Sequence, residues 1–356
     1  SDNCASIVID GFGIALKYLH YQKYPMASAE KIIKEMFYYL KMAFRQIISN
    51  QAWIPEAGKD QVTNELIEKL MQMTQSIKIN SQKDIMNDTI VDALYDGLKL
   101  NESSFILNVL KLKKFQVARL LMNVNEIFSE SMGPGFKPFD VNAYYNRELN
   151  SIVYICEGLQ EIPADLLHYP MFHKDYPMYL NFANLGTILA HEMAHGFDNT
   201  SIYYYKDGNF NSSWPDDFQT AFGNQAICFV EQYEKFKVPH IDKFVDGYLT
   251  LDENICDNTA LPLALLAYEM WAKDHDVHEP LLPQSNFTIE QIFFIATGQM
   301  ECQTNQVISQ MQAQDVHSPG PLRVKGVIQN SPNFGHIFGC PVGTPMNPTR
   351  KCSLWS

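Results

Sequence analysis

The fold is decided by one short stretch, His191-Glu192-Met193-Ala194-His195, which has the pattern H-E-x-x-H. The residues around it, from 181 to 197, have the apolar periodicity of a helix. Residues four apart lie on the same helix face, so both imidazoles can bind one metal ion. Glu192 lies beside them, close enough to take a proton from water at that metal. The stretch therefore predicts a metal centre that performs chemistry.

A third metal ligand is available further along the chain. Glu253 and Asp257 are four residues apart, so one helix can present Glu253 to the metal and Asp257 to a liganding imidazole. Two histidines and one glutamate with an open fourth position make a catalytic zinc site rather than a structural one. The alternative with a third histidine, H-E-x-x-H-x-x-G-x-x-H, is excluded because Asp198 and Ser201 occupy the Gly and His positions. We expect one Zn²⁺ per chain.

The composition indicates a folded chain that binds neither nucleic acid nor anionic membranes. Its 356 residues are 46% hydrophobic and only 19% charged, which is enough apolar surface for a sizeable core. The net charge of −13, without a dense basic block, would repel phosphate-rich partners. No run approaches the roughly 18 apolar residues of a membrane-spanning helix. We therefore expect membrane association only through a segment outside this sequence.

Two weaker features favour an extracellular glycoprotein. The seven cysteines form no close Cys-x-x-Cys pair of a structural zinc site, and their odd number leaves at least one thiol without a partner inside the chain. Triplets of the type Asn-x-Ser/Thr, which accept N-linked glycans, begin at Asn87, Asn101, Asn199, Asn211 and Asn286.

The region 1–140 is expected to be helical. After Ser28, a candidate N-cap, apolar residues recur at three- and four-residue steps at Ile33, Met36, Phe37, Leu40, Phe44 and Ile47. A second such series follows Pro55 at Val62, Leu66, Leu70, Met73 and Ile77. A third helix is predicted within 115–128. We expect these helices to provide packing and no chemistry.

A small β element is predicted between the two helical parts of the chain. Glycines and prolines at 133–138 predict a loop, after which β-branched and aromatic residues at 141–145 and 151–154 predict a hairpin or paired edge strands. The predicted fold class is therefore mainly α with a small β element. We divide the chain into a helical region, 1–140, and a catalytic domain, 141–356.

The order of these motifs resembles the neprilysin and endothelin-converting-enzyme family of zinc metalloendopeptidases. The matching segments are Val141–Tyr145, His191–Asp198, Glu253–Asp257, His317–Pro319 with Arg323, and Met346–Pro348 followed by Cys352 and Trp355. The resemblance covers nearly the whole chain. It implies a thermolysin-like zincin fold, of the gluzincin type, with the N-terminal helices packed against the catalytic domain.

The resemblance also implies hydrolysis of short extracellular peptides. Zinc would lower the pKa of bound water to about 7, and Glu192 would take the proton and return it to the leaving amine. His317 would stabilise the oxyanion, and Arg323 would bind a substrate carbonyl. No covalent intermediate is needed.

Four further residues receive roles from the resemblance. Asn142 and the backbone of Ala143 would bind the peptide main chain as an edge strand does, which holds the scissile bond over zinc. Asp198 and Asp257 would support the two zinc histidines from behind.

The resemblance implies how the cysteines are used. The residues equivalent to Cys228 and Cys352 form a disulfide in this family. Three others pair with an N-terminal lobe of the relatives that this sequence lacks, and we expect them to be free thiols: Cys4, Cys302 and Cys340. The missing lobe is the expected partner, and the protein is expected to be a type II ectodomain outside the plasma membrane or a secreted protein. Cys156 and Cys256 match no family disulfide and are expected to be small buried side chains.

Two stretches depart from the family. Ile155–Pro163 replaces the relatives' Pro-Ala-Gly-Ile-Leu-Gln-Pro-Pro-Phe, and Met300-Glu301 replaces their Val-Trp. The resemblance places both stretches at the apolar pocket for the residue after the cleaved bond. A buried carboxylate without a partner is costly, so we expect Glu301 to leave this pocket reshaped, more polar or opened.

Two other functions stay open at the level of sequence. A catalytically impaired surface or secreted binding protein, or an inactive partial chain, would keep the fold without turnover, and the altered pocket is consistent with this. A cytosolic metallo-aminopeptidase shares the zinc motif but needs a Gly-x-Met-Glu-Asn segment, which is not found. Zinc-dependent cleavage of end-blocked peptides separates the endopeptidase from both.

Overall fold

The computed structural model describes residues 7–9, 11–12, 15–16, 18–19, 22, 27–75, 88–101, 104–122, 143–154, 169–210, 213–310 and 315–356. The chain forms two compact units. The first comprises 1–32, 75–144 and 153–168, and the second comprises 33–74, 145–152 and 169–356. Both metal-site motifs lie in the second unit, together with the helices of residues 33–74.

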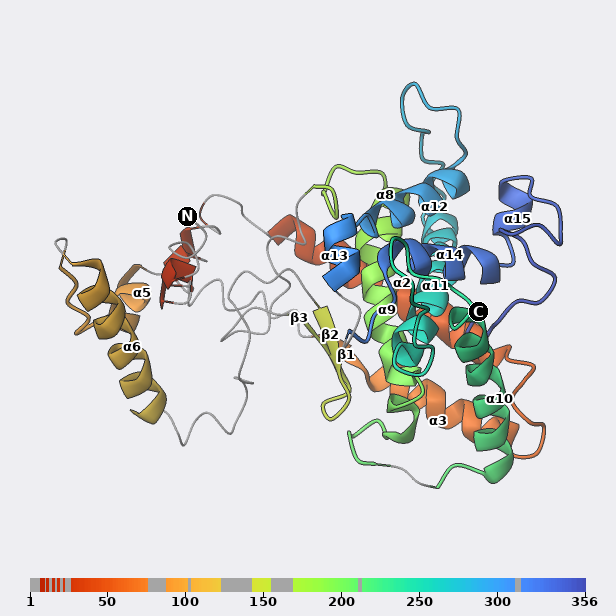
Figure 1. Cartoon of the computed structure of the whole chain (residues 1–356), viewed down its shortest axis with the longest axis horizontal. Helices are drawn as coiled ribbons and strands as arrows, with labels where there is room; N and C mark the ends of the chain where they lie inside the picture. The colour runs from red at the N-terminus through yellow and green to blue at the C-terminus, as the bar shows by residue number, and fades with distance from the viewer. Residues whose placement is uncertain are drawn as a thin grey trace. The chain divides into compact units, whose positions relative to one another are not determined.

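Helices dominate the described residues (Figure 1). The α-helices are α2 (Ala27–Ser49), α3 (Lys59–Gln72), α5 (Asp88–Leu94), α6 (Phe105–Met122), α8 (Met178–Asn181), α9 (Thr187–Ala194), α10 (Asp216–Tyr233), α11 (Leu251–Asp274), α12 (Ile289–Met300), α13 (Asn305–Gln310), α14 (Gly320–Asn330) and α15 (Phe334–Ile337). Short π- and 3₁₀-helical turns are η3 (Phe182–Gly186), η4 (His195–Phe197) and η5 (Ser201–Tyr203). One three-stranded sheet has the order β1 (Thr74–Gln75), β3 (Ser151–Tyr154), β2 (Ala143–Asn146). The predicted class, mainly α with a small β element, is confirmed.

The first predicted helix is α2, and its apolar face is almost the predicted one. Five of the six apolar positions in the series are buried, whereas Ile47 is only partly buried and Ile48 is fully buried in its place. The helix begins at Ala27, so Ser28 is its second residue rather than the N-cap. A period of 3.6 residues shifts the buried stripe along a long helix, which explains the change from 47 to 48.

The next two predicted helices exist with different ends. Helix α3 buries Val62, Leu66 and Leu70 as expected, but it ends at Gln72 and the chain turns into β1, so Met73 is buried outside the helix. The predicted extension of this helix to Ile77 is therefore wrong for residues 73–75, and residues 76–77 lie outside the described part of the chain. Helix α6 starts at Phe105, ten residues before the predicted start of 115, and is described to Met122.

The predicted hairpin is confirmed, since β2 and β3 are neighbours in the sheet. Its turn is held by Asn146, whose Oδ1 accepts hydrogen bonds from the backbone amides of Glu148 and Leu149, both at 3.0 Å. Asn150 has a positive φ of 46°, a conformation that asparagine adopts more readily than most residues. The predicted loop at 133–138 and the start of the first strand, 141–142, lie outside the described residues.

An aromatic cluster joins the N-terminal helices to the metal-site helix and the C-terminus. Phe44 of α2 packs edge-on against Phe197 at 4.9 Å between ring centroids, and Trp53 packs edge-on against Trp355 at 5.2 Å. The Trp355 indole donates a hydrogen bond of 2.9 Å to the Phe197 carbonyl, and the Trp53 indole donates one of 2.8 Å to the Leu354 carbonyl. This cluster fixes the end of the metal-site helix from two distant parts of the chain.

The metal-site helix is continuous from α8 through η3 and α9 to η4, as the apolar pattern from 181 to 197 predicts. Its η3 segment is π-helical, a distortion that is frequent near functional sites. Helix α11 packs along α9 (Figure 1). Asn254 of α11 is fully buried and accepts a 2.8 Å hydrogen bond from the Ser318 hydroxyl. That bond fixes the segment before α14 against α11.

The predicted disulfide between Cys228 and Cys352 is confirmed, and it joins α10 to the C-terminal segment. It closes a loop of 124 residues, so its loss gives the unfolded chain much more freedom. We expect the double substitution Cys228→Ala and Cys352→Ala to lower the free energy of unfolding by about 2–5 kcal/mol in denaturant titrations. The exposed free thiol Cys302 supplies the control Cys302→Ala. Equal stability of the two variants would contradict this expectation.

No helix among the described residues combines the length and the apolar character needed to cross a bilayer.

Candidate active site

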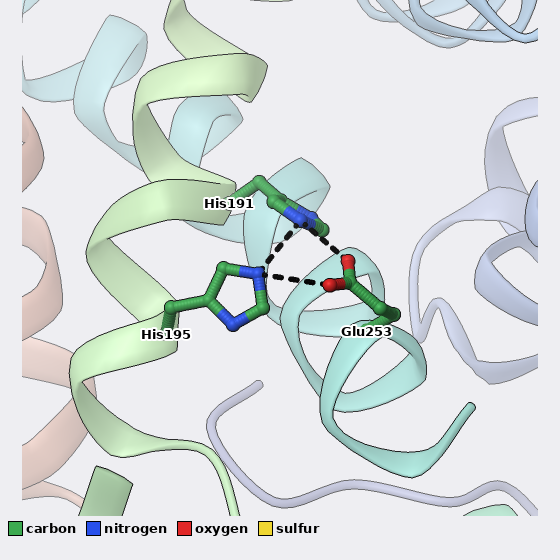
Figure 2. Close-up of side chains that lie close together, drawn as sticks. All are labelled: His191, His195 and Glu253. Atoms are coloured by element: carbon green, nitrogen blue, oxygen red, sulfur yellow. Dashed lines mark hydrogen bonds and ion pairs between the residues drawn. The ribbon is translucent and has the colours of Figure 1, made fainter. Parts of the chain in front are cut away.

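Three predicted metal ligands converge in the structure (Figure 2). Helix α9 carries His191 and leads into His195, and both rings point toward Glu253 of α11. The Nε2 atoms of the two histidines are 3.1 Å apart. The carboxylate of Glu253 lies 3.0 Å from His191 Nε2 and 3.5 Å from His195 Nε2. The i, i+4 spacing on α9 thus places two nitrogens and one carboxylate around a common point.

A carboxylate lies on the far side of each histidine ring. Asp257 Oδ1 is 2.9 Å from His191 Nδ1, and Asp198 Oδ2 is 2.9 Å from His195 Nδ1. When these nitrogens donate to the carboxylates, the neutral rings present Nε2 lone pairs to each other and to Glu253. Three acceptors that face one another at this distance repel unless a cation lies between them. The donor set therefore fits a zinc ion, which binds imidazole nitrogen and carboxylate oxygen.

The electrostatics of this cluster favour positive charge at the same point. Burial lowers the pKa of His191, but hydrogen bonds with Asp257 and Glu253 outweigh burial and raise that pKa to about 9. Burial raises the pKa of Glu253, and hydrogen bonds with His191, His195 and His317 outweigh it, so the pKa lies well below its usual range. Protons and a divalent cation compete for such nitrogens.

Glu192 is buried next to the two histidines and has an unsatisfied oxygen. Its Oε2 has no hydrogen-bond partner within the described part of the chain. Burial raises the pKa of this carboxyl, although the nearby charges of His191 and His195 lower it. A buried carboxylate oxygen without a donor is costly unless a ligand or water supplies one. Glu192 is thus placed to receive a proton at the point where the ligands converge.

His317 and Asp315 form the more exposed edge of the cluster. His317 Nε2 lies 3.2 Å from Glu253 Oε2, and its Nδ1 lies 2.9 Å from Asp315 Oδ1. The His317 side chain is 38% exposed, compared with 11% for Glu253. The structure therefore brings His317 to the ligand group from the segment before α14.

Arg323 of α14 binds the carboxylate behind His191. Its Nε and Nη2 donate to the two oxygens of Asp257 at 2.7 and 2.6 Å. Its Nη1 lies 3.6 Å from Glu301 Oε2, so the Glu301 carboxylate has a cationic neighbour rather than none. Asp257 thus has two contacts at once, one with a metal-site histidine and one with a guanidinium.

The residues predicted to bind the substrate as a strand, and several cysteines, are only partly described. Ala143 begins β2 and is buried, whereas Asn142 lies outside the described residues. Cys4 and the whole of Ile155–Pro163, which includes Cys156, lie outside them as well. Among the cysteines that the structure describes, Cys302 and Cys340 are free, as expected.

Cys256 is a small buried side chain, as expected, and it also touches the site. Its Sγ lies 3.2 Å from His195 Nδ1, on the same nitrogen that Asp198 contacts. His195, Asp198 and Cys256 form a second group whose donor atoms lie close enough for a metal. This contact was not predicted from the sequence, although the i+3 spacing of Cys256 from Glu253 places both on one side of α11.

Lys69 of α3 is a buried lysine that the sequence did not indicate. Its ammonium donates to the carbonyls of Ser201 and Tyr204 at 2.6 and 2.7 Å, which fixes the loop after Asp198. Asp198 Oδ1 in turn accepts from the Thr200 amide at 2.9 Å. Lys69 therefore supports the carboxylate behind His195. Hydropathy patterns give no signal for it, because a lysine on a helix is usually exposed.

Lys69 predicts a pH dependence of stability. Burial lowers its pKa from 10.5 to about 7. Between these values the unfolded chain binds more protons, so the free energy of unfolding rises with pH. From pH 7 to pH 9 we expect the wild type to gain about 1–2 kcal/mol relative to Lys69→Met, measured by denaturant titration. Parallel pH profiles of the two proteins would show that Lys69 keeps its ordinary pKa.

Residues 142–354 match peptidase family M13, and the chain belongs to this family. Neprilysin-1 of Caenorhabditis elegans is 32% identical over 362 residues, which cover 99% of this chain and 45% of the relative. Endothelin-converting enzyme 1 of Rattus norvegicus is 29% identical, over 99% of this chain and 44% of its own length. The chain thus spans about half the length of the curated relatives it matches. The resemblance derived from the motifs is confirmed.

The fold has counterparts among solved structures. The cryo-electron-microscopy structure of the Mycobacterium tuberculosis zinc metalloprotease Zmp1 in its open state aligns with a TM-score of 0.74 and 26% identity, covering 99% of this chain and 52% of that one. A Haemonchus galactose-containing glycoprotein complex aligns with a TM-score of 0.71 and 26% identity, covering 92% and 50%. The predicted zincin fold is confirmed by the zinc metalloprotease match.

Proposed function

We propose that this chain is the catalytic part of a zinc metalloendopeptidase that hydrolyses short extracellular peptides. The observation that carries the proposal is the convergence of His191 Nε2, His195 Nε2 and the Glu253 carboxylate beside the unsatisfied oxygen of Glu192. These three residues would hold one zinc per chain. Membership of peptidase family M13 supports the reaction class.

In the proposed reaction the protein positions a proton acceptor and charge-stabilising groups. Bound zinc would polarise the peptide carbonyl and make water more acidic. Glu192 takes a proton from the attacking water and passes it to the leaving amine. Burial raises the pKa of Glu192, which favours a group that must both accept and return a proton. Asp257 and Asp198 keep each ring turned so that Nε2 faces the metal.

The remaining residues bind the substrate. His317, at the exposed edge, is proposed to donate to the oxygen that becomes negative. Arg323 is proposed to contact a substrate carbonyl, and its bond to Asp257 holds it in place. Asn142 and the Ala143 backbone are proposed to pair with the peptide as an edge strand. The catalytic residues fall within the proposed domain 141–356, and the 1–140 region is proposed to pack against it.

The location is proposed to be extracellular, either as a secreted protein or as an ectodomain anchored through a segment outside this sequence. The disulfide between Cys228 and Cys352 supports an oxidising compartment. Asn101 and Asn286, two of the candidate glycan acceptors, are exposed. An N-terminal lobe like that of the longer relatives is the proposed partner.

The test is cleavage of an internally quenched peptide library with blocked ends. We expect cleavage that a chelator stops and that one equivalent of zinc restores. Blocked ends exclude an aminopeptidase, which needs a free amine. A chain that binds zinc and cleaves none of the library would instead support the binding-protein alternative.

A further inference from the structure

Glu301 is a carboxylate beside the site that the proposed mechanism leaves unused. It follows the last residue of α12 and is partly buried, with 25% of its side chain exposed. Its carboxylate lies 3.6 Å from Arg323, the residue that binds Asp257 behind His191. It therefore lies beside the site rather than at a distant surface.

The cation next to Glu301 is already engaged by another carboxylate. Arg323 donates two hydrogen bonds to Asp257 at 2.6 and 2.7 Å, whereas its Nη1 lies 3.6 Å from Glu301, beyond hydrogen-bond distance. The positive charge of Arg323 is therefore balanced mainly by Asp257. Two carboxylates share one guanidinium, so the charge of Glu301 is only partly compensated.

Because Glu301 is partly buried, its incompletely compensated charge favours some neighbouring side chains over others. A carboxylate that has lost most of its water gains from any donor that reaches it, and a charged donor contributes more than a neutral one. An apolar side chain in the same place would cover the carboxylate without giving it a hydrogen bond, which is unfavourable. A substrate carboxylate in the same place would be repelled by the charge of Glu301.

We propose that Glu301 selects peptides with a lysine or arginine next to the cleaved bond. This inference rests on the proposed endopeptidase function and specifies its substrate class. The ammonium or guanidinium of the substrate would donate to Glu301, while the bond that is cleaved lies over the ligand group of His191, His195 and Glu253. The disfavoured substrates are those with glutamate at the same position.

The test uses end-blocked peptides that differ only at the two positions flanking the cleaved bond, with lysine, methionine or glutamate at each. For the wild-type chain with zinc, we expect kcat/KM for lysine at one flanking position to exceed that for methionine by about ten- to a hundredfold. Glu301→Gln should reduce this ratio to about one while it retains turnover of the methionine peptide. Glu290→Gln, an exposed position at the other end of α12, is the control and should keep the lysine preference.

A binding measurement separates the inference from the proposed function. In the Glu192→Gln background, which should bind without turnover, the lysine peptide should bind more tightly than the methionine peptide, and the difference should disappear when Glu301→Gln is added. Cleavage with equal rates for lysine and methionine in the wild type would overturn the inference and leave the endopeptidase intact. Absence of any cleavage together with a lysine preference in binding would overturn the proposed function and support the role of Glu301.

Discussion

Replacing Glu192 with glutamine is expected to lower peptide turnover by about 10³-fold or more and to leave zinc bound. Glutamine keeps the size of the side chain but cannot take a proton from water. The orphaned Oε2 of Glu192 shows why the loss should be specific, because this oxygen has no bond to another described residue that the substitution could break. The measurements are kcat with an end-blocked peptide and zinc content of the same preparation.

Glu290→Gln provides the matched control for this experiment. It makes the same chemical change on an exposed residue of α12 and should leave both turnover and zinc content unchanged. Undiminished activity of Glu192→Gln would contradict the assignment of Glu192 as the general base. Loss of zinc together with activity would instead assign Glu192 to the metal.

Replacing Glu253 with alanine is expected to release the metal. Glu253 supplies the only carboxylate among the three converging ligands, and its loss also removes a partner of His317. We expect zinc affinity to fall by about 10²- to 10³-fold, measured by competition with a chelating dye. Asp257→Asn keeps all three ligands and weakens the support of His191 and the bond from Arg323, so it should lower zinc affinity less, by about 10- to 100-fold.

Full zinc occupancy of the Glu253→Ala variant, at the zinc concentration that is expected to half-saturate this variant, would show that the third ligand lies elsewhere. The nearest alternative is the second donor group, His195 with Asp198 and Cys256. Cys256→Ala separates the two possibilities, since it should leave zinc affinity nearly unchanged if Glu253 is the ligand.

The features that could be predicted from the sequence are those that depend on helical periodicity. The i, i+4 spacings of His191 with His195 and of Glu253 with Asp257 are set by the helix itself, so the sequence was sufficient to predict both pairs. The buried stripe of α2 was predicted for the same reason. Helix ends were predicted less well, as α6 shows, because ends depend on caps and on tertiary contacts rather than on periodicity.

The contacts that the sequence did not reveal act across the fold. Lys69 supports the loop after Asp198 from a helix more than a hundred residues earlier, with separations of 132 and 135 residues to its two carbonyl partners. Asn254 and Ser318 are 64 residues apart. Arg323 was predicted to face the substrate, and its bidentate bond to Asp257 became visible only with the packing of α14 on α11. Such contacts have no local spacing that a single sequence can show.

The most direct test of the proposed metal site is the position of zinc in crystals of the chain, measured by anomalous scattering at the zinc absorption edge. We expect one strong peak per chain at about 2.0–2.2 Å from His191 Nε2, His195 Nε2 and a Glu253 oxygen, with Glu192 adjacent but not bound. A peak at His195, Asp198 and Cys256, or zinc bound without His191 and Glu253, would contradict it.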